Sequence, residues 1–270
     1  MQTRKTFGTP GLKPAEEARF RSASWGPRIL GAAALWLGII GVVRADFTAI
    51  WHPVPDALPA RLVFVFTTAG IFIVAGLSLL VRGAGVRAPR TLAVLLALLS
   101  TGWLLRVVAY PQLVGTWVGF AEQMALALGA AAVAAGTPLR RSWLTCCRIG
   151  FGMCEVVFSL GHFMGLVETV AMTPAWLPFG RTFWALATGA IHLLGGVALI
   201  AGFKPTAATR VLAAMFAAFG LLVWLPKLLA NSSDPVAWSG NAINLALIGA
   251  VLSVGVGAKQ VPAKLPDRQA

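Results

Sequence analysis

Eight long apolar stretches run through the chain, separated by shorter segments that hold most of its charged residues. Each stretch approaches the roughly 20 residues that a helix needs to cross the hydrocarbon core of a bilayer. The pattern predicts an all-α, polytopic membrane protein with eight transmembrane helices, since helices satisfy their own backbone groups in lipid. The expected spans are residues 29–43, 62–81, 91–109, 116–136, 149–167, 182–202, 211–229 and 239–257.

The last four stretches read like a second copy of the first four. Landmark residues of the first copy are Pro59, Arg61, Gly70, Gly76, Arg90, Trp103 and Trp117. Those of the second copy are Pro178, Arg181, Gly189, Gly195, Arg210, Trp224 and Trp238, at intervals that differ by no more than one residue. Because four is an even number, both copies must enter the membrane from the same side. We therefore predict two parallel four-helix repeats about an axis along the membrane normal.

The segments outside the spans are too short to form a separate soluble domain. The expected organisation is an N-terminal tail 1–28, a first repeat 29–136, a connector 137–148, a second repeat 149–257 and a C-terminal tail 258–270. The first 28 residues are charged and contain Pro10 and Pro14, so they are interpreted as a cytosolic tail and not as a signal peptide.

Composition agrees with a membrane location, because 58% of the residues are hydrophobic and only 11% are charged. The formal net charge of +13 could suggest nucleic-acid binding. However, most of the Lys and Arg residues fall on the side of the membrane that holds the two tails. This is the positive-inside bias, which places both termini in the cytoplasm and predicts contact with anionic lipid head groups, with no nucleic-acid partner.

Ionisable side chains within the spans are candidates for function, because they are costly in hydrocarbon and need a partner or a cavity. Glu155 and His162 are two helical turns apart and so share one face, and Glu168 lies further along, near the outer end of the same span. With His192 in the next span, they indicate a site at the outer mouth of the second repeat. The alternative is that each is satisfied by a neighbouring helix or by Arg181.

Arg106 and Glu122 lie at similar depths in the third and fourth spans, and we expect a structural ion pair between them. The connections 44–61 and 168–181 both contain Pro and Trp. We expect Trp51 and Trp176 to anchor re-entrant or surface segments at the membrane interface, where Trp concentrates.

Motifs for catalysis or for a resident cofactor do not occur. The chain has no CxxC pair, HExxH, Walker loop or nucleotide-binding glycine motif, so no catalytic residue, metal site or encoded cofactor is predicted. A haem held by His162 and His192 is not favoured, because the first repeat has no such pair.

Several of these residues resemble the DoxX-like integral membrane proteins of bacteria. In the second half the resemblance is carried by Gly161-His162-Phe163, Glu168-Thr169, Pro174, Trp176-Leu177-Pro178, Thr188-Gly189-Ala190, His192 and Gly196. In the first half it is carried by Asp46-Phe47, Trp51, Pro53-Val54-Pro55, Gly70 and Gly76. It covers about residues 30–257 and implies a four-helix unit, here duplicated, in the bacterial cytoplasmic (inner) membrane. Some members are subunits of quinone-linked sulfur oxidoreductases or associate with membrane redox complexes, and most have no established activity.

The expected function is binding of a small apolar or amphipathic ligand, or support of a membrane oxidoreductase complex, without catalysis. The polar groups of the expected pocket are His162, Glu168 and Arg181, with Trp176 and Trp184 as its apolar wall. One alternative is a quinone-linked oxidoreductase subunit, with quinone as its cofactor. Another is a small-molecule transporter, whose polar path could include Glu122, Glu155 and His192.

Overall fold

The computed structural model describes residues 25–81, 85–135 and 141–256, and these residues form helices and connecting turns with no strand. The elements are α2 (Trp25–Arg44), η1 (Ala49–Trp51), α3 (Arg61–Leu80), α4 (Arg87–Ala109), α5 (Val114–Ala135), α6 (Arg141–Met164), α7 (Leu166–Met172), α8 (Arg181–Ala201), α9 (Pro205–Phe219), η3 (Gly220–Trp224), α10 (Leu225–Ala230) and α11 (Pro235–Val256). Eight helical segments in the described ranges are long and apolar enough to cross a membrane, with α9, η3 and α10 forming one of them. The predicted all-α, polytopic fold is confirmed.

The helices begin earlier than the hydrophobic pattern suggests. The first span starts at Trp25, inside the expected N-terminal tail, and the fifth starts at Arg141, inside the expected connector. The fifth span also ends early, because Gly165 leaves helical geometry (φ −99°, ψ 40°) and the chain restarts as the short helix α7. The expected tail residues 1–24 and 258–270 and connector residues 137–140, together with residues 82–84, 136 and 257, lie outside the described ranges.

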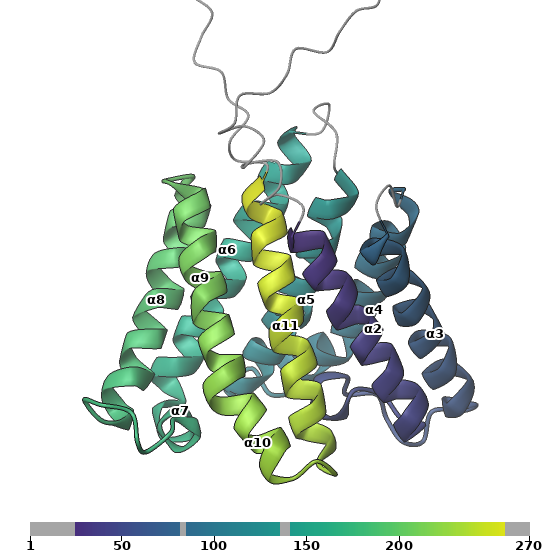
Figure 1. Cartoon of the computed structure of the whole chain (residues 1–270), viewed down its shortest axis with the longest axis horizontal. Helices are drawn as coiled ribbons and strands as arrows, with labels where there is room; N and C mark the ends of the chain where they lie inside the picture. The colour runs from purple at the N-terminus through teal and green to yellow at the C-terminus, as the bar shows by residue number, and fades with distance from the viewer. Residues whose placement is uncertain (1–24, 82–84, 136–140, 257–270) are drawn as a thin grey trace, which may run out of the picture.

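Successive spans run in opposite directions, so α2 and α6 point the same way and the described chain begins and ends at one end of the bundle (Figure 1). We call the opposite end, which holds α7 and α10, the far end. The halves use equivalent helix contacts. In each repeat the first helix packs against the second (α2 with α3, α6 with α8) and the third against the fourth (α4 with α5, α9 with α11). The predicted parallel four-helix repeats are therefore confirmed.

The two repeats meet through their first and last helices. The last helix of each repeat packs against the first helix of the other, α11 against α2 and α5 against α6. The helices α5 and α11 meet on the approximate two-fold axis. Gly129 of α5 lies against Ala250 of α11 so closely that a Cβ on the glycine would overlap the alanine. These two positions are separated along the chain by the same interval as Trp117 and Trp238. The contact therefore joins equivalent positions of the two repeats.

Equivalent hydrogen bonds also relate the repeats. The indole of Trp117 donates to the carbonyl of Pro111 (2.9 Å), and the indole of Trp238 donates to the carbonyl of Ser232 (2.7 Å). Each acceptor lies six residues before its tryptophan, in the turn that precedes the helix. The landmark residues Trp117 and Trp238 thus hold the same structural position in the two repeats.

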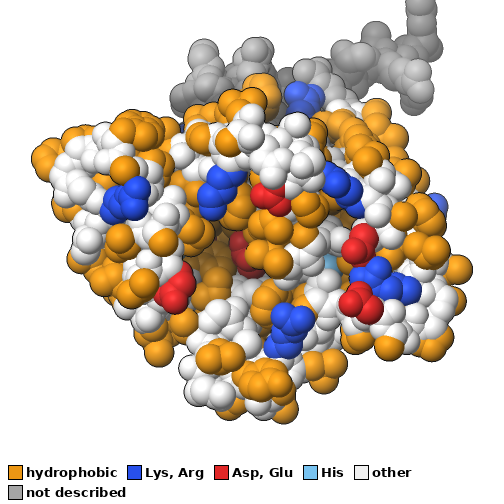
Figure 2. Space-filling view, turned by 90° about the horizontal axis from the view of Figure 1, so that it is seen from below, with side chains coloured by type: hydrophobic (Ala, Val, Ile, Leu, Met, Phe, Trp, Pro, Cys, Tyr) orange, Lys and Arg blue, Asp and Glu red, His pale blue; other side chains and the backbone are white. Residues whose placement is uncertain are grey.

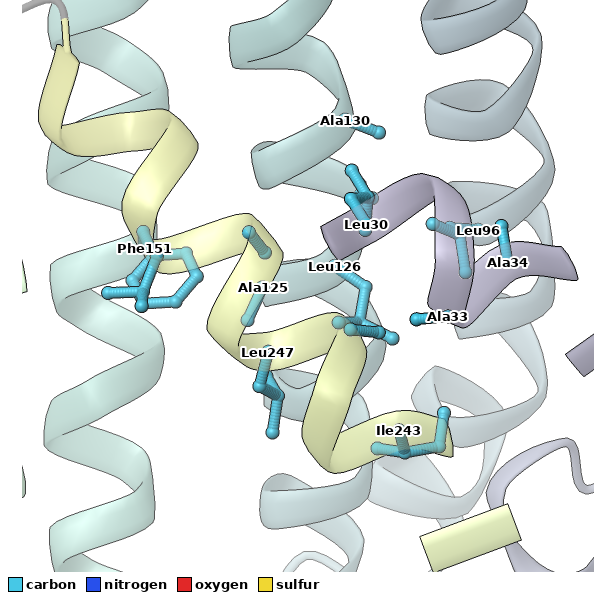
Figure 3. Packing of buried hydrophobic residues seen from close by; sticks show 14 of the residues in the cluster. Leu30, Ala33, Ala34, Leu96, Ala125, Leu126, Ala130, Phe151, Ile243 and Leu247 are labelled. Atoms are coloured by element: carbon cyan, nitrogen blue, oxygen red, sulfur yellow. The ribbon is translucent and has the colours of Figure 1, made fainter. Parts of the chain in front are cut away.

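Small residues bring the helix backbones close together. In the first repeat Gly31 and Gly76 each face the other's carbonyl oxygen, and in the second repeat Gly152 and Gly196 do the same. The structural counterpart of Gly76 is therefore Gly196, one residue beyond the Gly195 suggested by the sequence intervals. Around the axis, alanine and leucine side chains of α2, α5 and α11 fill the core (Figure 3). Such close approach lets dispersion contacts hold helices together in lipid.

Candidate functional site

A cavity of about 680 Å³ opens between the two repeats in the half of the bundle nearer the far end. Its lining comes from both repeats, with residues of η1, α4 and α5 facing residues of α6, α7, α8, α9, η3 and α11. Seen from the far end, the molecule is hollowed and the walls of the hollow are mostly hydrophobic (Figure 2). The volume lies within the range of about 300–1,000 Å³ that is common for small-molecule sites.

Aromatic side chains from both repeats line the cavity. The rings are those of Trp51, Trp103, Phe158, Phe216, Phe219 and Trp224. Trp103 and Trp224 are counterparts in the two repeats, and each indole packs against a glycine of the following span, Gly119 and Gly240 respectively. A Cβ at either glycine would overlap the indole, so both tryptophans need glycine there to lie at the cavity wall.

Trp51 links three elements at the side of the cavity formed by the first repeat. Its indole nitrogen donates to Oε2 of Glu122 (2.9 Å), and its carbonyl accepts from the indole of Trp103 (2.8 Å). Its ring also meets Trp224 edge to face, with 5.5 Å between centroids. Only 5% of Trp51 is exposed, so it lies inside the bundle, and the expectation that it anchors a segment lying on the surface is wrong. The connection after α2 folds inward because the indole N–H and the backbone carbonyl of Trp51 both have hydrogen-bond partners inside the bundle.

Arg106 and Glu122 do not form the expected ion pair. Glu122 bonds to Trp51, whereas Arg106 is exposed and holds its guanidinium 5.2 Å from the ring centroid of Trp103. The repeat counterpart Lys227 holds its ammonium 4.8 Å from the ring centroid of Trp224. Similar depth in two helices does not decide which side chains meet, and Arg106 lies over the ring of Trp103 instead of meeting Glu122. No Lys or Arg of the described ranges lines the cavity.

A second polar cluster occupies the side of the cavity formed by the second repeat. Nδ1 of His192 lies 2.6 Å from Oε2 of Glu155, and both residues are buried. One carboxyl oxygen of Glu155 therefore has its partner on a neighbouring helix. The ring of His162 lies beside that of His192, with 4.9 Å between centroids. Glu155 and His162 do share a face of α6, and that face is turned toward His192 of α8.

The hydrogen bonds assign one proton of this cluster. Nδ1 of His162 lies 3.0 Å from the carbonyl oxygen of Phe158, which can only accept, so Nδ1 carries hydrogen. Nε2 of His162 is buried and has no partner among the described residues, and the same holds for Oε1 of Glu155. The cluster thus retains unused hydrogen-bonding capacity beside the cavity.

Of the other residues expected in the pocket, only Glu168 lines the cavity. Glu168, on α7, is exposed and lines the mouth of the cavity. Trp176 and Arg181 are exposed and do not line it, and Trp184 is also outside the lining, with its indole donating to the carbonyl of Pro178 (2.7 Å). The structure therefore places the cavity between the repeats and not within the outer ends of the second repeat alone.

The seventh span contains a π-helical turn, η3, beside the cavity. Asn244 of α11 lines the cavity and, with its amide oxygen toward Gly220, accepts from that backbone N–H (2.8 Å) and donates to the carbonyl of Phe216 (3.3 Å). The Gly220 N–H also donates to the carbonyls of Phe216 and Ala217, so the Asn244 amide adds a side-chain link from α11 to the start of the π-helical turn. Pro226, two residues beyond η3, is the signal in the sequence for an irregular span.

His52 lies in the connection that holds Trp51, outside the membrane-spanning helices. Its ring stacks on Phe72, with 6.0 Å between centroids and 3° between planes, and only 3% of the residue is exposed. Burial lowers the pKa of His52 from 6.5 to about 4, with the side chain of Gln123 opposing part of the shift. His52 therefore packs the connection that holds Trp51 against Phe72 of α3 as a neutral ring.

Comparison with protein-family models, with curated proteins and with solved structures finds no match to this chain. Among the described residues, no three His, Cys, Asp or Glu side chains gather as a metal site would require.

Proposed function

We propose that this protein binds a small, mostly apolar ligand with one polar group in the cavity between its two repeats. The observation that carries the proposal is the convergence of Glu122 and the His162–His192 pair on a cavity whose walls are aromatic. Known ligand sites combine a largely apolar lining with a few placed polar groups in this way.

The polar groups of the cavity have capacity that a ligand can use. Buried polar atoms without partners cost free energy, about 1–3 kcal/mol each, and a bound molecule that supplies a partner recovers part of that cost. Glu122 is half-buried and is already oriented by Trp51, so its carboxyl is placed before a ligand arrives.

The resemblance to DoxX-like proteins adds a biological setting to the proposal. In that setting the protein lies in a bacterial inner membrane with its basic chain ends in the cytoplasm, and the cavity opens toward the other side. For the alternative in which the protein supports a membrane oxidoreductase complex, the ligand would be a quinone whose head group lies against the aromatic walls and the histidines. A quinone-linked oxidoreductase subunit and a small-molecule transporter are the alternative proposals.

Two glycines offer a matched test, because a Cβ at either one meets no atom within 4 Å. Gly115 lines the cavity, whereas Gly70 lies on α3 outside the lining. The Gly115→Phe protein and the Gly70→Phe control are purified in mild detergent beside the unchanged protein. Co-purified small molecules are then identified by mass spectrometry.

We expect a small molecule that accompanies the unchanged protein and the Gly70→Phe control and is depleted in the Gly115→Phe protein. The same profile in all three proteins would refute binding in the cavity. Net substrate flux in proteoliposomes that is blocked by Gly115→Phe would favour the transporter, and electron transfer to quinone by a co-purified partner would favour the oxidoreductase subunit.

A further inference from the structure

The charged residues that line the cavity are all acidic. Glu122 lies at its wall and Glu168 at its mouth, and no Lys or Arg in the described part of the chain joins them. The nearest basic side chains noted above, Arg106 and Lys227, stack on Trp103 and Trp224 without entering the lining. The cavity is thus an acidic site with aromatic walls, apart from its pair of histidines.

From this arrangement we infer that the ligand is a lipophilic organic cation, whose positive charge rests at Glu122 among Trp51, Trp103 and Trp224. The inference depends on the proposed function and adds to it the chemical class of the ligand. The class comprises amines and quaternary ammonium or phosphonium ions that carry apolar groups.

The carboxyl group of Glu122 favours such a ligand. An ionised carboxylate inside a membrane protein is costly unless a counter-charge or several hydrogen bonds compensate it. Within the described residues, the side-chain donor to Glu122 is the single indole of Trp51, and Arg106 faces elsewhere. A cation that enters the cavity supplies the counter-charge that the protein withholds.

The tryptophans favour the same ligand independently. The faces of aromatic rings are electrostatically negative and attract cations, most strongly for tryptophan. Trp103 and Trp224 enter the cavity from opposite repeats, and Trp51 connects them through its hydrogen bond to Trp103 and its ring contact with Trp224. Arg106 and Lys227 already lie over one face of Trp103 and Trp224. The charge of the ligand therefore meets the remaining ring surfaces and the Glu122 carboxyl group, which repel an anion of the same shape.

A pair of ions with matched shape provides the test. Tetraphenylphosphonium and tetraphenylborate are nearly the same size and have opposite charge. Binding of each is measured by equilibrium dialysis against the protein in lipid nanodiscs, with empty nanodiscs subtracted. The proteins compared are the unchanged chain, Glu122→Gln and Asp56→Asn, the last being a matched carboxyl-to-amide change at a fully exposed far-end side chain.

We expect the unchanged protein to bind the phosphonium at least about tenfold more tightly than the borate, and Glu122→Gln to lose about tenfold in phosphonium affinity. Asp56→Asn should keep the affinity of the unchanged protein. Because Glu122→Gln could also weaken the fold, its melting temperature is measured. Trp51→Phe serves as a second variant, which keeps the Glu122 carboxyl group but removes its indole hydrogen-bond donor.

Three results would overturn the inference: equal binding of the two ions, tighter binding of the borate, or unchanged phosphonium affinity in a folded Glu122→Gln protein. If neither ion binds but a neutral molecule co-purifies and is excluded by Gly115→Phe, the inference that the ligand is a cation is refuted, while the proposed function stands. If no molecule depends on Gly115, the proposed function fails as well.

Discussion

The indole nitrogen of Trp51 lies 2.9 Å from Oε2 of Glu122, although the two residues are 71 positions apart. This hydrogen bond fastens the connection between the first two spans to the fourth span. The carbonyl of Trp51 extends the link to Trp103 of the third span. Trp51 thereby holds together residues of α4, α5 and η3 that line the cavity.

Replacing Trp51 by Phe should weaken the fold. The change keeps an aromatic ring in the buried position but removes the only N–H of the indole, leaving Glu122 without this donor. Because Glu122 is only half-buried, we expect a loss of about 1 kcal/mol, the usual net contribution of one hydrogen bond, measured by thermal or SDS-induced unfolding in detergent. Trp176→Phe is the control, because Trp176 is 68% exposed. Equal losses in the two variants would contradict the role given to Trp51.

The Glu155–His192 pair has a natural replacement in the first repeat. Measured from the paired glycines of each repeat, the equivalent positions hold Ala34 and Phe72, and both are buried there. Glu155→Ala alone leaves the buried His192 without its partner and should cost about 1–3 kcal/mol. The double variant Glu155→Ala with His192→Phe copies the first repeat and should recover most of that loss. Unfolding of both variants in detergent measures the difference, and a double variant no more stable than the single one would refute the equivalence.

Stability should also depend on pH through His52. Its pKa in the folded protein is about 4, below the value of 6.5 for a free side chain, so folding favours the neutral ring. Above pH 6.5 its full contribution is present. As the pH falls from 6.5 toward 4 the unfolded chain takes up a proton that the folded one refuses, and stability drops by up to about 3 kcal/mol.

The check compares unfolding across this pH range for the unchanged protein and for His52→Phe, which retains a ring to stack on Phe72. The variant should show a smaller loss on acidification. Identical pH profiles would mean that His52 is not held neutral by burial.

Membrane sidedness is a separate prediction, which depends on the distribution of Lys and Arg. Fluorescent protein fused to either chain terminus should fluoresce, because both termini are expected in the cytoplasm. Alkaline phosphatase inserted at Asp56, in the exposed connection at the far end, should be active. An active phosphatase at either terminus would reverse the orientation without changing the fold.

Much of the fold follows from patterns that a single sequence contains. Apolar length predicts the spans, and the spacing of Trp103 and Trp117 against Trp224 and Trp238 predicts the repeat, because these residues pack in equivalent ways. Helical periodicity likewise places Glu155 and His162 on one face. These features depend on residues close together in the chain or on a regular interval.

The features that were not predicted depend on how helices rotate and which connections fold inward. Depth alone suggested an ion pair for Arg106, but the rotation of α4 turns that side chain outward. A tryptophan in a connection is typical of a membrane interface, yet Trp51 is drawn inward by distant partners. The place of the cavity between the repeats follows from the packing of both halves, which no local pattern contains.

A structure of the protein in lipid nanodiscs, determined at a resolution that shows bound molecules, tests the central claim most directly. The account predicts density for a ligand between Trp103 and Trp224, close to Glu122, in the unchanged protein and in Gly70→Phe, and no such density in Gly115→Phe. A cavity that is closed by protein side chains in the unchanged protein, or density that persists in Gly115→Phe, would contradict it.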